Sequence, residues 1–375
     1  MTKAYHKTDA ENSRNFFTIR TKKAAGAFAG IAISAEMDYT EAMKKILLIG
    51  TGGTIASDMT ADGLAPKLGS NQLLNYIPRV SEICDVDCMQ LMSVDSTNMT
   101  PENWLTIAKC VEAYYDAYDG FVVSHGTDTM AYTAAALSYL ARRSKKPIVL
   151  TGAQKPISMD VTDSKQNLLD AFTYACDDRA CGVSIVFNGS VILGTRAKKV
   201  RSKSFSAFAS INYPELAVLQ DGRVLHYIDL GYRERAKFSH TLNASVGLVK
   251  LIPGSDADIL NFALDKYDAV IIESFGVGGL PEGTNGCFRA AIDRGVKAGK
   301  LIVITTQVQN EGSNLTVYQV GHALKQQNII EAYDMTTEAA VAKLMWIMGE
   351  TRDPDRVRER FYTPLSHDIL YTEAE

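Results

Sequence analysis

The chain has 375 residues, of which 46% are hydrophobic, so it is long enough to bury the cores of two domains. Its formal net charge is -4, with acidic and basic residues interspersed, which gives no reason to expect a nucleic-acid partner. No run of the sequence approaches the roughly 18 consecutive apolar residues of a membrane span. The composition therefore favours a globular protein that binds neither nucleic acid nor membrane.

The cysteines do not predict a metal centre. Six of them are scattered through apolar segments, namely Cys84, Cys88, Cys110, Cys176, Cys181 and Cys287. Cys84 and Cys88 have the spacing of metal ligands, but no second cysteine pair or histidine cluster accompanies them. Buried thiols in a reducing compartment are therefore expected.

Residues 1–42 differ in character from the rest of the chain. A polar, basic opening is followed by an Ala/Gly-rich, weakly apolar run over residues 24–35. That order resembles a secretory signal, but a poor one, because Glu36 follows the run directly. Met43, two lysines and an apolar strand then look like the natural beginning of a folded domain. We expect a disordered extension over residues 1–42 and a cytoplasmic protein.

One strand–turn–helix segment organises the rest of the sequence. Apolar residues 121–123 predict a buried parallel strand, and the Ala-rich run 129–140 predicts a helix. Ligands of open α/β sheets bind beyond the carboxyl ends of the strands, and the turn at this place carries the Thr127 hydroxyl and the Asp128 carboxylate. The alternative interpretation is that Asp128 merely caps the helix and Thr127 fills the turn.

A glycine-rich turn follows the first apolar strand, residues 46–49. It fails the dinucleotide pattern at the sixth position, where Ile55 replaces Gly or Ala, and it lacks the Gly-Lys-Ser/Thr of a phosphate loop. What remains is a turn that permits close backbone approach and presents Thr54. Residues 57–70 predict a mobile loop that could cover a site.

The rest of the first half alternates strands with helices. Thr100 as N-cap and Pro101 predict the start of one helix. Strands are predicted at residues 147–151, 183–187 and 191–193, a helix at residues 164–176, and a hairpin turn at Asn188-Gly189. The hairpin leads to the basic cluster of residues 194–199, a pattern that usually marks a solvated face.

The second half repeats the alternation after a polar, irregular stretch at residues 221–243, which suits a linker. Strands are predicted at residues 246–252, 269–273 and 301–305, and helices at residues 255–264, 287–298 and 337–348. The fold class is therefore α/β, with two doubly wound domains. Residues 43–220 form the large N-terminal domain with a mainly parallel sheet, and residues 244–375 form the smaller C-terminal domain.

The polar residues at the predicted strand ends favour acyl transfer. They are Thr54, Ser96, Thr127, Asp128, Ala153 (through its backbone) and Lys199. No histidine joins them, since His125 is expected to pack behind the turn, so neither a metal nor a cofactor is expected. A threonine hydroxyl needs a base, and a desolvated lysine can serve. Backbone N–H groups of the glycine-rich turns could form an oxyanion hole worth about 3 kcal/mol per donor.

Several motifs together resemble the bacterial L-asparaginases, specifically their cytoplasmic type I branch. They are Thr51-Gly52-Gly53-Thr54-Ile55, Asp95-Ser96-Thr97-Asn98-Met99-Thr100-Pro101, His125-Gly126-Thr127-Asp128-Thr129, Gly152-Ala153-Gln154 and Ser274-Phe275-Gly276-Val277-Gly278-Gly279. The match runs from about residue 43 to about residue 363. Two threonine motifs at these positions in one chain are highly specific, whereas either glycine-rich turn alone is not.

The resemblance implies an amidohydrolase that converts L-asparagine and water to L-aspartate and ammonia. Thr54 would be the nucleophile on the side-chain amide carbon. Thr127, Asp128 and Lys199 would form a second catalytic group, with Lys199 at the Gly-x-Arg-x-x-Lys position counted from Gly194.

The resemblance also implies how substrate is bound and how the protein assembles. Ser96, with Thr97 beside it, would bind the α-carboxylate, and Asp128 would bind the α-ammonium. The Ala153 carbonyl would orient the departing amide nitrogen. The family places its sites between the large domain of one subunit and the small domain of another, which implies a homodimer or homotetramer.

The sequence departs from the family pattern at two places. Residues 57–70 contain no tyrosine, although the family often places one there beside the threonine nucleophile, so another tyrosine or water must replace it. Lys198 and Glu273 replace the neutral and basic residues of the allosteric site of some type I enzymes. Allosteric activation is therefore not expected.

Two other functions are compatible with parts of this pattern. One is the related amidotransferase subunit, which releases ammonia from glutamine or asparagine for tRNA-dependent synthesis. The other is a non-catalytic amino-acid-binding protein, which would use Asp128 and Ser96 but would have no need of Thr54 or Lys199. Release of ammonia from asparagine by the chain alone separates the three.

Overall fold

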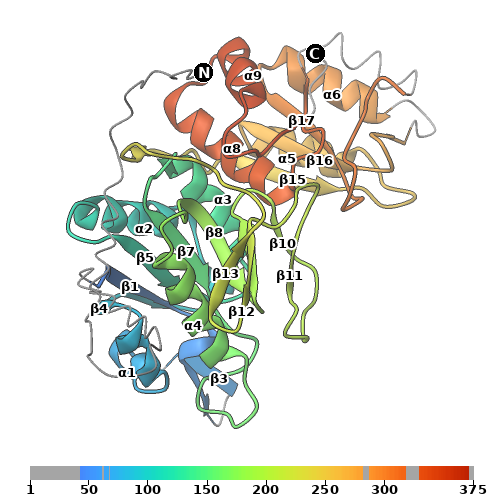
Figure 1. Ribbon diagram of the computed structural model, residues 1–375. Helices are drawn as coiled ribbons and strands as arrows, with labels where there is room; N and C mark the ends of the chain where they lie inside the picture. Colours follow the sequence, from blue (N-terminus) through green and yellow to red (C-terminus); the bar gives the residue numbers. More distant parts are fainter. Residues whose placement is uncertain (1–42, 61–62, 67, 282–286, 318–328, 371–375) are drawn as a thin grey trace, which may run out of the picture. The chain divides into compact units, whose positions relative to one another are not determined.

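The computed structural model describes residues 43–60, 63–66, 68–281, 287–317 and 329–370 (Figure 1). The extension expected at residues 1–42 lies outside the described residues. Within those ranges, no helix is both long enough and apolar enough to cross a membrane.

The large sheet has eight strands in the order β13-β12-β9-β8-β7-β5-β1-β4 (Figure 1). Five neighbours pair in parallel: β4 (Asp85–Val94), β1 (Lys45–Gly52), β5 (Gly120–Ser124), β7 (Pro147–Thr151) and β8 (Gly182–Phe187). Three antiparallel strands complete the sheet: β9 (Ser190–Leu193), β12 (Ala217–Gln220) and β13 (Arg223–His226). A mainly parallel sheet was predicted, and this prediction is confirmed.

Helices cover both faces of this sheet, so its central strands read as unbroken apolar runs. In β1, Leu47 and Ile49 face a core that contains α2 (Pro101–Tyr114) and α3 (Met130–Leu140). Ile46 and Leu48 face a second core that contains α1 (Ser70–Leu74) and α4 (Ser164–Ala175). The alternation follows from the two-residue period of a strand.

The predicted helix start and hairpin turn are both present. Thr100 is the N-cap of α2, and Pro101 is its first residue. Asn188 and Gly189 join β8 to β9 with φ angles of 51° and 77°, the left-handed conformation that a tight two-residue hairpin requires. The hairpin reverses the chain, so β9 runs antiparallel to β8 and Leu193 at its end pairs with Ser184.

The small sheet consists of four parallel strands, β15 (Val246–Lys250), β16 (Ala269–Ser274), β17 (Leu301–Thr306) and β18 (Ile330–Glu331). The core on one of its faces includes α5 (Asp258–Lys266) and α6 (Cys287–Lys297). Its other face shares a core with α8 (Thr337–Glu350) and α9 (Pro354–Tyr362). That core continues into the large domain, because α8 packs on α3 (Figure 1).

Two stretches differ from expectation. Within residues 57–70, where a loop was expected, β2 (Ser57–Thr60) and β3 (Gly63–Pro66) form an antiparallel hairpin. The stretch expected to be a linker at residues 221–243 contains β13, the edge strand of the large sheet, and β14 (Lys237–Phe238), which pairs with β6 (Ala141–Arg142). Short edge strands need few apolar residues, so their sequences resemble loops.

A fully buried ion pair stabilises the end of the chain against α8. Lys343 and Asp368 are both 0% exposed, and Lys343 Nζ lies 2.7 Å from Asp368 Oδ2. Lys343 Nζ also donates to the Thr363 carbonyl, while Asp368 accepts hydrogen bonds from Tyr139 Oη and the Leu365 N–H. The ion pair and these hydrogen bonds offset the cost of removing both charges from water.

Removing only the cation should therefore destabilise the fold severely. Lys343→Met is expected to lower the free energy of unfolding by about 3–5 kcal/mol, because it leaves the Asp368 carboxylate buried without its counterion. Adding Asp368→Asn removes that charge but keeps an acceptor, so the double variant should be more stable than the single one. Urea unfolding of the three proteins measures this, and a double variant that is less stable than Lys343→Met would contradict it.

Candidate functional site

The turn after β5 is supported from behind by His125, as predicted. Its ring is fully buried, and Nδ1 donates to the Gly126 carbonyl at 2.7 Å. The Thr133 hydroxyl, from the first turns of α3, donates to Nε2 at 2.9 Å, so the neutral ring has both nitrogens satisfied. Burial lowers the pKa of His125 to about 4. His125 is therefore a neutral structural support of the turn.

Three separate turns converge at Gly126. A Cβ added at Gly53, whose φ is +86°, would lie 2.5 Å from the Gly126 Cα, and a Cβ added at Gly126 would lie 2.5 Å from Ser96 Oγ. Neither glycine therefore tolerates a side chain. Thr54 follows Gly53, and Thr127 follows Gly126. The two threonine-bearing turns and Ser96 are thus neighbours at the carboxyl edge of the sheet.

Lys199 reaches the same turn from β10 (Ala197–Lys199). Its Nζ donates to Thr127 Oγ1 at 2.8 Å and to Asp128 Oδ1 at 2.6 Å, and its side chain is only 16% exposed. Asp128 is not the helix cap, because Thr129 occupies the N-cap position of α3. The amine, the hydroxyl and the carboxylate therefore form one hydrogen-bonded group, and Lys199 is not part of a solvated face.

Gln154 is a member of this group that the sequence alone did not predict. Its Oε1 accepts from Thr127 Oγ1 at 3.3 Å, and its Nε2 donates to the carbonyls of Arg201 and Ser204. These contacts orient the amide so that its oxygen faces the threonine. A glutamine in the turn that follows β7 was the available signal, because β7 is the neighbour of β5 in the sheet.

Ala153 and Ser96 are both buried, at 1% and 3% exposure, whereas Thr97 is exposed. The turn that contains Ala153 is fixed by Asp163, whose carboxylate accepts from the backbone N–H groups of Gln154 and Lys155. The Thr97 N–H donates to Asp95 Oδ1 at 3.0 Å. Ser96 is buried beside Gly126, while the exposed Thr97 lies on the outer side of its turn.

The sequence matches two family models that together cover most of the chain. One describes the N-terminal domain of asparaginases and matches residues 45–230. The other describes the glutaminase/asparaginase C-terminal domain and matches residues 245–361. This chain belongs to the asparaginase family.

Curated relatives carry two kinds of name. An L-asparaginase of Thermococcus kodakarensis is 36% identical over 318 residues, which covers 84% of this chain and 96% of the relative. L-asparaginase 1 of Escherichia coli is 34% identical over 327 residues, with 84% and 95% covered. One subunit of the glutamyl-tRNA(Gln) amidotransferase of Pyrococcus furiosus is 32% identical over 355 residues, with 90% and 80% covered. Both archaeal and bacterial proteins are thus similar to this asparaginase-family chain.

Solved structures of the family have the same fold. The thermostable L-asparaginase from Thermococcus kodakarensis superimposes with a TM-score of 0.81 at 34% identity, covering 88% of this chain and all of that one. A probable cytoplasmic L-asparaginase from Campylobacter jejuni gives a TM-score of 0.74 at 26% identity, with 85% and 99% covered.

His125 makes the stability of the site depend on pH. The unfolded chain binds the imidazole proton with a pKa near 6.5, and the folded chain with a pKa of about 4. Its contribution to stability is therefore complete above pH 6.5 and decreases as the pH falls toward 4, where about 3 kcal/mol is lost. Urea unfolding from pH 7 to pH 4 should give a shallower pH dependence for His125→Asn than for the wild type. Parallel curves would show that the ring is not held neutral.

Proposed function

We propose that this protein is an L-asparaginase of the type I branch, which hydrolyses L-asparagine to L-aspartate and ammonia without a cofactor. The observation that carries the proposal is the bonding of Lys199 Nζ to Thr127 and Asp128, directly beside the turn that presents Thr54. A binding protein would have no use for a sequestered amine on a threonine hydroxyl. Membership of the asparaginase family supports the same reaction.

In this proposal, binding of substrate prepares the amine. Asp128 is the exposed partner, with 58% of its side chain accessible, and Lys199 is the sequestered one. The α-ammonium of asparagine would bind the Asp128 carboxylate from the open side and so compete with Lys199 for it. Lys199 would then donate to Thr127 alone, so that the pair can pass a proton on through the hydroxyl. Ser96, flanked by Thr97, would hold the α-carboxylate.

The chemical steps follow from this placement. The Thr54 oxygen would attack the side-chain amide carbon, and the Thr127–Lys199 pair would deliver a proton to the nitrogen as ammonia leaves. The Ala153 carbonyl would orient that nitrogen. Water would then release aspartate from the acyl-threonine. Backbone N–H groups at the glycine-rich turns would stabilise the oxyanion, at about 3 kcal/mol per donor.

Thr54 needs its own proton acceptor. Residues 57–70 contain no tyrosine, and the backbone there forms the hairpin β2–β3. The acceptor would therefore be water or a tyrosine that comes from another part of the polypeptide.

We also propose a cytoplasmic homodimer or homotetramer that binds neither nucleic acid nor membrane. Its large domain would span residues 43–220 together with the edge strand β13, and its small domain residues 244–375. The net charge of -4 argues against a nucleic-acid partner. Cys84, Cys88, Cys110, Cys176 and Cys181 are free thiols, which suits a reducing compartment.

Replacement of the reacting groups should abolish turnover without unfolding the protein. Thr54→Ala, Thr127→Ala and Lys199→Met are each expected to lower kcat by about 10³-fold or more, because each removes a group that acts in the transition state. Lys155→Met is the matched control: its Nζ lies over the Phe205 ring rather than on Thr127, so its effect should be mild. Ammonia release from asparagine by the purified chain measures all four.

The wild-type result also separates the functions. Release of ammonia by the chain alone supports an asparaginase, whereas release only with a second protein component would indicate an amidotransferase, and no release a binding protein. Full activity of either threonine variant would remove that residue from the mechanism.

Saturation by asparagine should be hyperbolic. Around the positions where some type I enzymes bind an activator, the charged side chains are already compensated. Lys198 Nζ lies 3.4 Å from Glu338, Lys250 Nζ lies 3.6 Å from Glu273, and the Thr337 hydroxyl donates to Glu273. A substrate molecule would have to break these pairs to bind there. Initial rates over a wide range of asparagine concentrations should fit a Hill coefficient near one, and sigmoidal kinetics would contradict this.

A further inference from the structure

The segment that carries Lys199 is fixed by the small domain of the same chain. The Thr195 hydroxyl donates to the Ser366 carbonyl at 2.6 Å, and the Thr195 carbonyl accepts from the Thr336 hydroxyl at 3.2 Å. Thr336 is the N-cap of α8. Side chain and backbone of Thr195 are therefore both bound to residues that follow β18.

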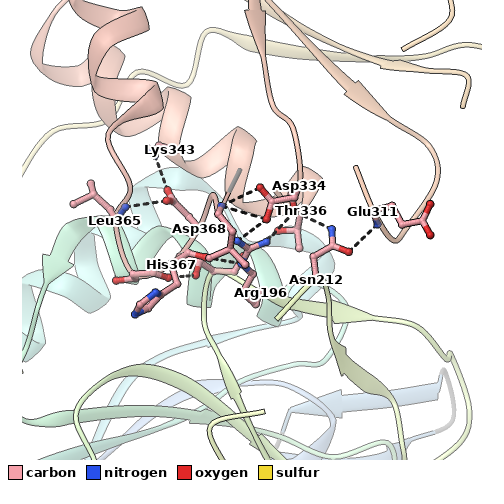
Figure 2. A network of polar contacts seen from close by, with 12 residues as sticks. Arg196, Asn212, Glu311, Asp334, Thr336, Lys343, Leu365, His367 and Asp368 are labelled. Atoms are coloured by element: carbon pink, nitrogen blue, oxygen red, sulfur yellow. Dashed lines mark hydrogen bonds and ion pairs between the residues drawn. The ribbon is translucent and has the colours of Figure 1, made fainter. Parts of the chain in front are cut away.

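Arg196 makes the strongest of these contacts (Figure 2). It is 0% exposed; Nε donates to the His367 carbonyl at 2.6 Å, and Nη1 donates to the Asp334 carbonyl at 2.8 Å. Its Nη2 lies 2.9 Å from Asp334 Oδ2. Two nitrogens of a planar, rigid group thus donate hydrogen bonds while the third lies in ion-pair contact, a combination that a lysine could not reproduce.

The acceptors themselves are held in place. Ser366 and His367 are consecutive non-glycine residues with φ angles of 49° and 50°, a conformation that costs of order 1 kcal/mol per residue and persists only where surrounding contacts impose it. The His367 ring stacks on Tyr213 at 5.2 Å. The Asp334 carboxylate also accepts from the Leu370 N–H, at 3.0 Å. The oxygens that receive Arg196 are therefore preorganised.

The three residues that follow Arg196 end at Lys199. They form β10, which is paired with β11 (Phe208–Ser210), and the Ile211 N–H donates to the Arg196 carbonyl at 2.8 Å. Successive side chains of a strand point to opposite faces, so Lys198 reaches Glu338 of α8 while Lys199 reaches Thr127. A displacement of Arg196 would consequently be passed on to the Lys199 amine.

A buried ion pair contributes little net stability compared with apolar residues of the same size. The Arg196–Asp334 pair is therefore better explained by the position that it gives to neighbouring residues. We propose that Arg196, through Asp334 and the His367 carbonyl, is a positioning residue that holds Lys199 Nζ within hydrogen-bonding distance of Thr127. This inference rests on the proposed function for its kinetic consequence. Its geometric part, the placement of the Lys199 amine, stands independently.

The kinetic test compares Arg196→Met with two further proteins. A misplacement of about 1 Å can cost about 10²-fold in rate, so we expect kcat to fall by about that factor with KM changed by less than about 3-fold. In a Lys199→Met background, Arg196→Met should cause no additional loss, because the group that it positions is gone. Arg196→Lys should not rescue kcat, since one ammonium cannot satisfy three oxygens.

Lys146→Met is the matched structural control. Lys146 Nζ also donates to two backbone carbonyls, those of Tyr115 and Tyr118, but it lies just before β7, at the other end of the strands. It should lower the unfolding midpoint in urea without lowering kcat. Asp334→Asn keeps the size of the side chain and removes only its charge, and it replaces Arg196→Met in the kinetic test if that variant does not fold. It should also lower kcat while KM stays nearly unchanged.

A measurement without substrate separates the inference from the proposed function. Trace acetylation with acetic anhydride, followed by mass spectrometry, reports the reactivity of each amine, with exposed Lys203 as internal reference. Lys199 should react several-fold faster in Arg196→Met than in the wild type, because its amine loses its partners. Unchanged labelling would overturn the inference. So would a loss of kcat caused by Arg196→Met in the Lys199→Met background that equals the loss it causes in the wild type. A wild type without asparaginase activity would overturn the proposed function and leave the labelling result to decide the geometry.

Discussion

Two glycines from different turns are in close backbone contact at the centre of the site, and the chemistry proposed for the site depends on that contact. Gly53 and Gly126 lie just beyond the ends of different strands, and a Cβ on either would collide with the other turn or with Ser96. Parallel strands bring their carboxyl ends to one edge of a sheet but leave them about 4.8 Å apart. Only glycine lets the loops close that remaining gap. Thr54 and Thr127, which follow these glycines, are brought together by this approach.

The two charged groups of the site differ in burial. Lys199 is largely enclosed, Thr127 is buried, and Asp128 opens to solvent. The Lys199 ammonium lies between the Thr127 hydroxyl and the exposed Asp128 carboxylate. A second cation that binds this carboxylate can therefore replace Lys199 there without any movement of the protein. An amino acid carries such a cation, on the carbon that also bears the carboxylate suited to Ser96. The arrangement thus favours a free amino acid over a simple amide as substrate.

Much of the fold could be predicted because its elements are locally encoded. Apolar runs flanked by glycine predicted the parallel strands, and Asn188-Gly189 predicted the hairpin that reverses the chain. The hairpin β2–β3 and the edge strand β13 could not be predicted, since their pairing partners, rather than their own apolarity, define them. In the candidate site, Thr127, Asp128 and Lys199 were identified together. Gln154 and Arg196 were not predicted, because most of their partners are backbone carbonyls, which leave no signature in a sequence.

The two domains are joined by two kinds of contact with different consequences. The apolar core is continuous from the large sheet through α3 and α8 to the small sheet. Hydrophobic burial is non-directional, so it holds α8 against α3 without defining how far one slides along the other. Hydrogen bonds from Thr195 and Arg196 to particular carbonyls do define it, and they lie within this same interface (Figure 2). Cohesion between the domains therefore comes from the core, whereas the register that places Lys199 comes from the buried polar network.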